Sequence, residues 1–159
     1  MRKTAELLSL VALAALAFIT INVFYGPHPL PARIPTHFDA LGHANGWGSP
    51  YTLLFFPIFA AGLYLFLTVI SRFPSTFNYP VKVTELNRAR LEPLALDLVA
   101  CTKAEVLFFF AWMEFVMVQA ARHPEQGFQP YPVFVFVGIL FATIIGYIVA
   151  MFRARNPAH

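Results

Sequence analysis

The stretch that decides the fold is LLSLVALAALAFITINVFY, residues 7–25, which contains no charged side chain. A bilayer core of about 30 Å requires roughly 20 mostly apolar residues for one helical crossing. Three more stretches meet this requirement, at about residues 51–71, 99–121 and 133–152. The sequence therefore predicts four membrane-spanning helices.

The composition of the whole chain agrees with this interpretation. Of its 159 residues, 58% are hydrophobic and 12% are charged, whereas soluble domains have about a quarter charged residues. The first apolar segment follows a basic start, as in a signal peptide, but no small-x-small cleavage site follows it. We expect an all-α integral membrane protein, with residues 1–159 forming one four-helix transmembrane bundle.

The positions of lysine and arginine predict the orientation of the chain. They gather before the first segment, between the second and third, and after the fourth, and short basic loops normally stay in the cytoplasm. Both termini and the loop at residues 72–95 are expected in the cytoplasm, and the loop at residues 26–50 faces the periplasm or exterior of a bacterial inner membrane. The same distribution explains the pI of about 9.2 by contact with membrane lipids, so no nucleic acid is expected as a partner.

The outer loop contains IPTHFDALGHANGWGSPY, residues 34–51, which is unusually polar for such a chain. His37, Asp39 and His43 have side chains that can ligate zinc or another divalent metal. Their spacing matches no helical H-E-x-x-H or comparable pattern. A divalent metal held by these three residues is one hypothesis, and otherwise no cofactor is expected.

Other residues of this loop predict a constrained shape. The loop is rich in glycine, and Asn45 precedes Gly46 in a turn dipeptide. Trp47 is placed to lie in the headgroup layer before the second helix. Ser49, directly before Pro50, is placed to cap that helix. The sequence therefore predicts a loop of constrained shape, which either supports a ligand site or packs tightly as a lid on the helices.

The third predicted helix is unusual because it carries Lys103, Glu105 and Glu114. Ionisable residues inside membrane helices are costly and are functional candidates by default. Lys103 and Glu105 lie close enough to the cytoplasmic end for their side chains to extend to the headgroups. Glu114 lies too deep for that, so we expect either a protonated structural glutamate or a site residue facing a cavity below the outer loop.

The fourth predicted helix has small residues at every fourth position, namely Gly138, Ala142, Gly146 and Ala150. Such a ridge lets another helix approach closely. The first helix, with Ala5, Ser9 and Ala12, is the expected partner, and a homo-oligomer formed through Gly138, Ala142 and Gly146 is the alternative.

The run LPARIPTHFDALGHANGWGSP, residues 30–50, resembles the signature of a bacterial membrane domain-of-unknown-function family, approximately L-P-x-x-I-P-x-H-F-x-x-x-G-x-x-[DN]-x-W-G-S-[KR]. His37, Asn45, Trp47 and Ser49 match the pattern, whereas Pro50 replaces its basic residue and His43 falls at an open position. This domain also forms the first part of Sdp-type toxin-immunity proteins. Some proteins with this signature are immunity or signalling proteins for a secreted peptide toxin, and most have no assigned role, so immunity or signalling is one role that the resemblance implies.

Three functional hypotheses follow. We expect a non-enzymatic membrane protein that recognises a peptide, a lipid or an envelope partner at the outer leaflet, with His37, Asn45, Trp47, Ser49 and Glu114 as ligand-binding residues. The first alternative is an accessory subunit of a larger membrane protein complex. The second is a membrane-embedded metal-dependent hydrolase, with Glu114 as general base.

Overall fold

The computed structural model describes residues 1–155. The four helices are α1 (Arg2–Tyr25), α2 (Phe55–Ile70), α3 (Glu85–Arg122) and α4 (Tyr131–Arg153). Between α1 and α2 lies a two-stranded hairpin, β1 (Ile34–Phe38) and β2 (Ala44–Gly48), and short 3-10 turns occur at η1 (Pro50–Leu54), η2 (Pro74–Thr76) and η3 (Pro124–Gln126). The protein is thus mostly helical, and the hairpin is an addition to the predicted all-α fold.

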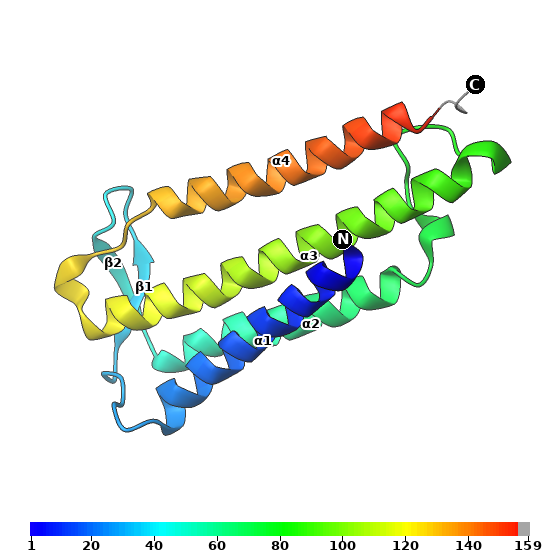
Figure 1. Cartoon of the computed structure of the whole chain (residues 1–159). Coiled ribbons are helices and arrows are strands. Elements are labelled where there is room, and N and C mark those ends of the chain that lie inside the picture. Colours follow the sequence, from blue (N-terminus) through cyan, green and yellow to red (C-terminus); the bar gives the residue numbers. More distant parts are fainter. Residues whose placement is uncertain (156–159) are drawn as a thin grey trace.

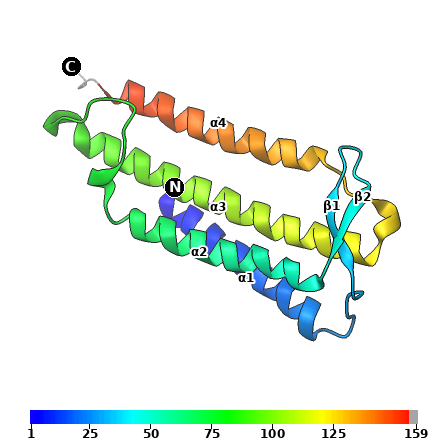
Figure 2. The same ribbon diagram turned by 180° about the vertical axis from the view of Figure 1, so that it is seen from behind.

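The helix α3 lies at the centre of the molecule, with α4 on one side and the α1–α2 pair on the other (Figures 1 and 2). The most extensive helix packing joins α1 to α3, and α4 packs mainly against α3. Among residues 1–155, α4 has no comparable packing with α1 or α2. The four helices therefore do not close around a common core as a four-helix bundle does.

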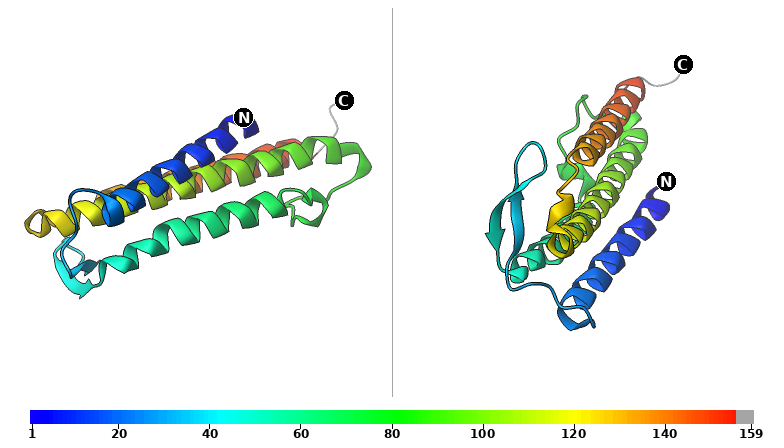
Figure 3. Two further views of the ribbon diagram at one scale, coloured as in Figure 1. Left: turned by 90° about the horizontal axis from the view of Figure 1, so that it is seen from below. Right: turned by 90° about the vertical axis from the view of Figure 1, so that its left-hand side faces the viewer.

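The small residues of α1 and α4 do not meet, contrary to the prediction. Ala5 is buried against Ala100 and Ala104 of α3 instead, and Ser9 and Ala12 are also buried. A Cβ added at Gly138 or Gly146 would meet nothing within 4 Å. Because α3 lies between α1 and α4, as Figure 3 also shows, the small ridge of α4 faces outward.

The helix α3 begins fourteen residues earlier than the predicted start near residue 99, and it continues through Pro93. Thr84 precedes its first turn, and the Oδ1 atom of Asn87 accepts a hydrogen bond from the Thr84 backbone N–H at 2.8 Å. This hydrogen bond is one half of a capping box, in which the side chains of Thr84 and Asn87 each accept from the backbone N–H of the other residue. A capping box stabilises the start of a helix. Leu91 and Ala95, on either side of Pro93, are buried against Met151 of α4. Packing and capping together offset the cost of about 3 kcal/mol of a proline inside a helix.

Asn87 also links the segment that precedes α3 to the end of α4. Its Nδ2 atom donates hydrogen bonds to the carbonyls of Lys82 and Arg155, each at 3.1 Å. The side chain is buried, so all three of its hydrogen bonds are shielded from water. Residues predicted as the loop at 72–95 thus include the first turns of α3 and a fixed junction with α4.

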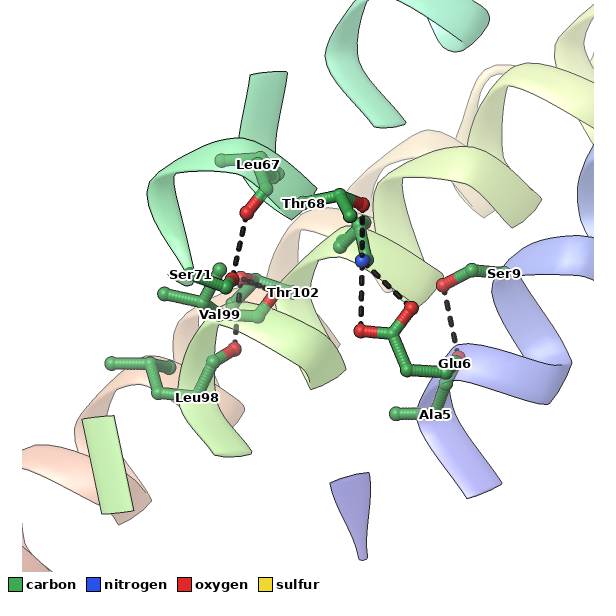
Figure 4. A network of polar contacts seen from close by, with 10 residues as sticks. Ala5, Glu6, Ser9, Leu67, Thr68, Ser71, Leu98, Val99 and Thr102 are labelled. Atoms are coloured by element: carbon green, nitrogen blue, oxygen red, sulfur yellow. Dashed lines mark hydrogen bonds and ion pairs between the residues drawn. The ribbon is translucent and has the colours of Figure 1, made fainter. Parts of the chain in front are cut away.

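Lys103 does not extend to the headgroups as predicted but is completely buried between three helices. Its Nζ atom lies 2.8 Å from both carboxylate oxygens of Glu6 on α1 and 3.1 Å from the hydroxyl of Thr68 on α2 (Figure 4). It also lies 4.7 Å from the centre of the Tyr64 ring. All three N–H donors of the ammonium are satisfied, so this network joins α1, α2 and α3.

Among the described residues, three segments rather than the predicted four are long and apolar enough to cross a membrane, namely Arg2–Tyr25, Pro50–Ile70 and Tyr131–Arg153, and the stretch predicted at residues 99–121 is not among them. Many of their large apolar side chains are exposed, including Phe18, Phe66 and Phe141. An apolar surface of this kind suits hydrocarbon rather than water. These properties are those of a membrane protein.

Candidate functional site

The polar stretch at residues 34–51 forms an antiparallel hairpin at one end of the helices, next to the last turns of α3 (Figure 2). Ile34 pairs with Gly48 and Phe38 with Ala44, and the register shifts on either side of His37. Such irregularities change the direction in which side chains point. The expected structured loop is therefore a short, irregular sheet.

The tip of the hairpin is held by Asp39 and Gly42. One Asp39 oxygen, Oδ1, accepts hydrogen bonds from the backbone N–H groups of Leu41 and His43, each at 2.9 Å. The hydrogen bond from the His43 backbone lowers the pKa of Asp39 below its ordinary value of 3.8. Gly42 has φ +86°, and its carbonyl accepts from the Phe128 backbone N–H at 2.8 Å. The α3–α4 connection thereby fixes the tip in place.

The hairpin has one face toward the helices and one face toward the outside. Ile34 is buried in a core cluster with Leu53, Val118 and other residues of α1 and α3, and Phe38 packs against it. On the other face His37, Asn45 and Trp47 are exposed. We call these three residues the hairpin face.

The hairpin face is ordered by contacts within the hairpin itself. The Nδ1 atom of His37 is in hydrogen-bond contact with Oδ1 of Asn45 across the two strands. Arg33 donates from Nη2 to the Trp47 carbonyl at 3.1 Å. Gly46 is required at the crossing, because a Cβ there would lie 2.8 Å from the His37 Cβ. These side chains therefore project from a backbone of fixed shape.

Glu114 does not share a cavity with His37. Its side chain is completely buried, and Oε1 accepts a hydrogen bond from the hydroxyl of Thr20 on α1 at 2.7 Å. The other oxygen, Oε2, has no hydrogen-bond partner among the described residues. His37 instead faces outward on the far side of the hairpin. The predicted ligand set thus divides into an exposed group on the hairpin and a glutamate inside the helix packing.

Ser49 has the capping position predicted for it. Its Oγ accepts from the Tyr51 backbone N–H at 3.3 Å, at the start of the 3-10 turn η1. The α-helix itself begins one turn later, at Phe55. The geometry therefore gives Ser49 a structural task at the start of this turn.

The proposed metal ligands are not assembled as one group. His43 Nδ1 lies 3.3 Å from Asp39 Oδ2, but His37 is engaged with Asn45 on the outer face. Within residues 1–155, no three His, Cys, Asp or Glu side chains are placed to hold a metal ion. The donor atoms of His37, Asp39 and His43 therefore do not fit a metal centre, since Asp39 supports the hairpin tip.

A polar hollow of about 470 Å³ lies between the hairpin and the α3–α4 connection. The hairpin side is formed by residues 41–44 and Trp47, and the other side includes Glu125, Gln126 and Gln129. Trp47 therefore belongs to both the hairpin face and the hollow. Sequence reasoning did not find this hollow, because it requires two loops that are eighty residues apart. The residue that comes closest to indicating this hollow in the sequence is Gly127, because its φ of +66° sets the shape of the second loop.

Comparison with known proteins shows a similarity to one family model in the first part of the chain. A family model described as a domain of unknown function, DUF1648, matches residues 12–61. The match runs from α1 through the hairpin into α2 and covers about a third of the chain. It confirms the resemblance to a domain-of-unknown-function family over the stretch that contains the hairpin face. No curated protein and no solved structure matches this chain.

Proposed function

We propose that the chain is a non-enzymatic polytopic membrane protein that recognises a polypeptide partner at the outer leaflet. The observation that carries this proposal is the exposed and ordered row of His37, Asn45 and Trp47. Each of these side chains projects from the face of the hairpin that does not pack on the helices.

The chemistry of the hairpin favours a polypeptide over a charged headgroup. The acidic groups nearby already have partners, because Asp39 holds the hairpin tip and Glu125 lies 3.5 Å from His123. The Arg33 guanidinium donates to the Trp47 carbonyl. What remains is a largely uncharged set of hydrogen-bonding groups around an indole, which suits the amide groups and side chains of a peptide.

A secreted peptide toxin is a specific form of such a partner, and immunity or signalling would be the corresponding role. This narrower form is motivated by the motif resemblance to toxin-immunity proteins at residues 30–50. It is tested by expressing the chain in toxin-sensitive bacteria. We expect the wild-type chain to reduce killing and Trp47→Ala to abolish that protection, while Tyr25→Ala retains it.

Photo-crosslinking tests the broader proposal. A photoreactive amino acid replaces Asn45 in the full chain in native membranes, and a matched control places it at Tyr25, which is 87% exposed and ends α1 near the hairpin. Irradiation should give one protease-sensitive adduct from position 45 that disappears when Trp47→Ala is added. A lipid adduct, no adduct, or an equal adduct from position 25 would contradict recognition of a polypeptide by the hairpin face.

A second candidate is an accessory subunit of a membrane complex, and the open side of α4 favours it. A groove of about 460 Å³ runs between α1 and α4, with Glu105 and Ala104 of α3 at its floor. Glu105 Oε1 accepts from the hydroxyl of Thr143 at 2.5 Å, while its Oε2 is buried without a partner in the described part of the chain. A partner helix with a hydrogen-bond donor would satisfy that oxygen.

Purification in mild detergent separates the two candidates. A stoichiometric second chain that is lost in Glu105→Leu but kept in Trp47→Ala would support the accessory subunit. A single species unaffected by Glu105→Leu would refute it.

A further inference from the structure

A second groove, of about 260 Å³, lies between α1 and α3 near the hairpin end of both helices. Its apolar walls come from both helices: Phe18 and Ile19 on α1, and Phe115 and Val118 on α3. Phe18 and Phe115 are 68% and 48% exposed, so they border the groove rather than fill the core. One edge of the groove lies beside apolar helix surface that suits hydrocarbon, and a lipid chain has the matching shape and polarity.

The end of the groove nearest the hairpin is polar, which an acyl chain alone would not require. Arg122 and Gln119 of α3, Asn22 of α1, and His28 from the following loop form this rim. No carboxylate within residues 1–155 lies within 4 Å of the Arg122 guanidinium. A cation without a counter-ion at the polar end of an apolar groove matches the phosphate of a phospholipid.

Other groups of the rim accept hydrogen bonds. The Nδ2 atom of Asn22 donates to the Phe18 carbonyl at 2.8 Å, which leaves its amide oxygen as an acceptor. Both α1 and α3 also end here, and each helix C-terminus carries a partial charge of roughly −0.5. These two partial charges offset the single positive charge of Arg122. The rim therefore complements a headgroup with no net charge that has both a phosphate and a hydrogen-bond donor.

We propose that this groove binds one phospholipid whose headgroup carries a phosphate and a primary ammonium, as in phosphatidylethanolamine. Arg122 binds the phosphate, while the amide oxygen of Asn22 and the helix-terminal carbonyls receive the ammonium. One acyl chain lies between Phe18 and Phe115. The site is separate from the hairpin face, because none of its residues belongs to the hairpin.

Native mass spectrometry of the full chain in detergent tests this site by titration with defined ligands. The ligands are phosphatidylethanolamine, phosphatidylglycerol, diacylglycerol and free phosphorylethanolamine. We expect one saturable binding event for phosphatidylethanolamine, with an affinity at least about tenfold higher than that of each other ligand. Each of the other ligands lacks either a charge-assisted hydrogen bond of the headgroup or the contacts of the acyl chains.

Three variants assign the binding to the groove. Arg122→Gln should weaken phosphatidylethanolamine binding about tenfold, and Phe115→Ala should weaken it severalfold without disturbing a core position. Arg33→Gln is the matched control, because this arginine lies at the same end of the molecule but outside the groove. The affinity of this variant for phosphatidylethanolamine should stay within about twofold of wild type.

Each alternative outcome contradicts the proposal in a different way. Equal binding of diacylglycerol would show that the rim recognises no headgroup. Tight binding of free phosphorylethanolamine would show a soluble-phosphate site instead of a lipid site. Stronger binding of phosphatidylglycerol would refute the assignment of the ammonium, and an equal loss in Arg33→Gln would show general charge attraction.

Discussion

Removal of Glu6 should destabilise the protein more than removal of its partner Lys103. In Glu6→Ala, the ammonium of Lys103, which is completely buried in the wild type, is left with only the Thr68 hydroxyl and the Tyr64 ring beside it. Breaking a buried ion pair in this way costs about 3 to 5 kcal/mol, and the remaining contacts place the expected loss near 3 kcal/mol.

Removal of Lys103 leaves the Glu6 carboxylate without its partner, which costs less free energy than an unpaired buried ammonium. The side chain of Glu6 is 36% exposed, so in Lys103→Met the carboxylate can be solvated, and methionine fills much of the volume of the lysine stem. We expect a loss of about 1 kcal/mol, mainly from the hydrogen bond to Thr68. The double variant should be more stable than Glu6→Ala by at least about 1 kcal/mol, because no unpaired ammonium remains in it.

The free energy of unfolding of the four proteins can be compared in mixed micelles with a rising fraction of a denaturing detergent. The decisive quantity is the sign of the difference between the double variant and Glu6→Ala. If the losses of the two single variants simply add, or if Glu6→Ala costs less than Lys103→Met, the network does not hold the helices in the way described.

Three further predictions use the same unfolding measurement or a local probe. Gly42→Ala should destabilise the hairpin by at least about 1 to 2 kcal/mol, because φ is +86° and the new Cβ would lie 1.8 Å from a carbonyl oxygen of the α3–α4 connection; Gly146→Ala, which meets nothing within 4 Å, should be neutral or stabilising. Asn87→Ala should cost about 2 to 3 kcal/mol through its three buried hydrogen bonds, whereas exposed Asn78→Ala should change stability by less than about 0.5 kcal/mol. Because the folded-state pKa of Asp39 is lowered from 3.8, its stabilising effect is complete above that value and is lost as the pH falls through the lower folded pKa; amide exchange at the hairpin tip should speed up there in wild type but show no such step in Asp39→Asn.

Much of the helical part could be predicted, because helices that face lipid are long runs of apolar residues, which the sequence shows directly. The segments expected at residues 7–25 and 133–152 correspond to α1 and α4, with ends that differ by a few residues. Pro50 and Ser49 marked the start of the second segment, although a 3-10 turn precedes the α-helix there. Capping and an apolar run are local signals, so the sequence contains them directly.

The hairpin could not be predicted in the same way, because its stability comes from distant residues. The strands IPTHF and ANGWG lack the alternation of β-branched residues that is typical of strands. Ile34 is stabilised by burial against Val118, and the tip by the backbone of Phe128. The start of α3 differs from the prediction for a related reason, since tertiary packing of Leu91 and Ala95 carries the helix through Pro93.

The candidate site was predicted in part. The exposure of His37, Asn45 and Trp47 follows from the polar motif, but the direction of Glu114 depends on how α1 packs, through Thr20. Lys103 and Glu6 are 97 residues apart, and no spacing rule joins residues so distant. Pairing between helices is information that a single sequence carries only weakly.

The packing of α4 mainly against α3 has a consequence for synthesis, which proceeds from the N-terminus. The Glu6, Thr68 and Lys103 contacts and the core of α1, α2 and α3 all lie before residue 123. A nascent chain can therefore complete this three-helix unit before α4 leaves the ribosome. The helix α4 then packs against a surface of α3 that is already folded. The register of α4 is set by the hydrogen bond from Thr143 to Glu105 and by the contacts of its end with Asn87 and the first turns of α3.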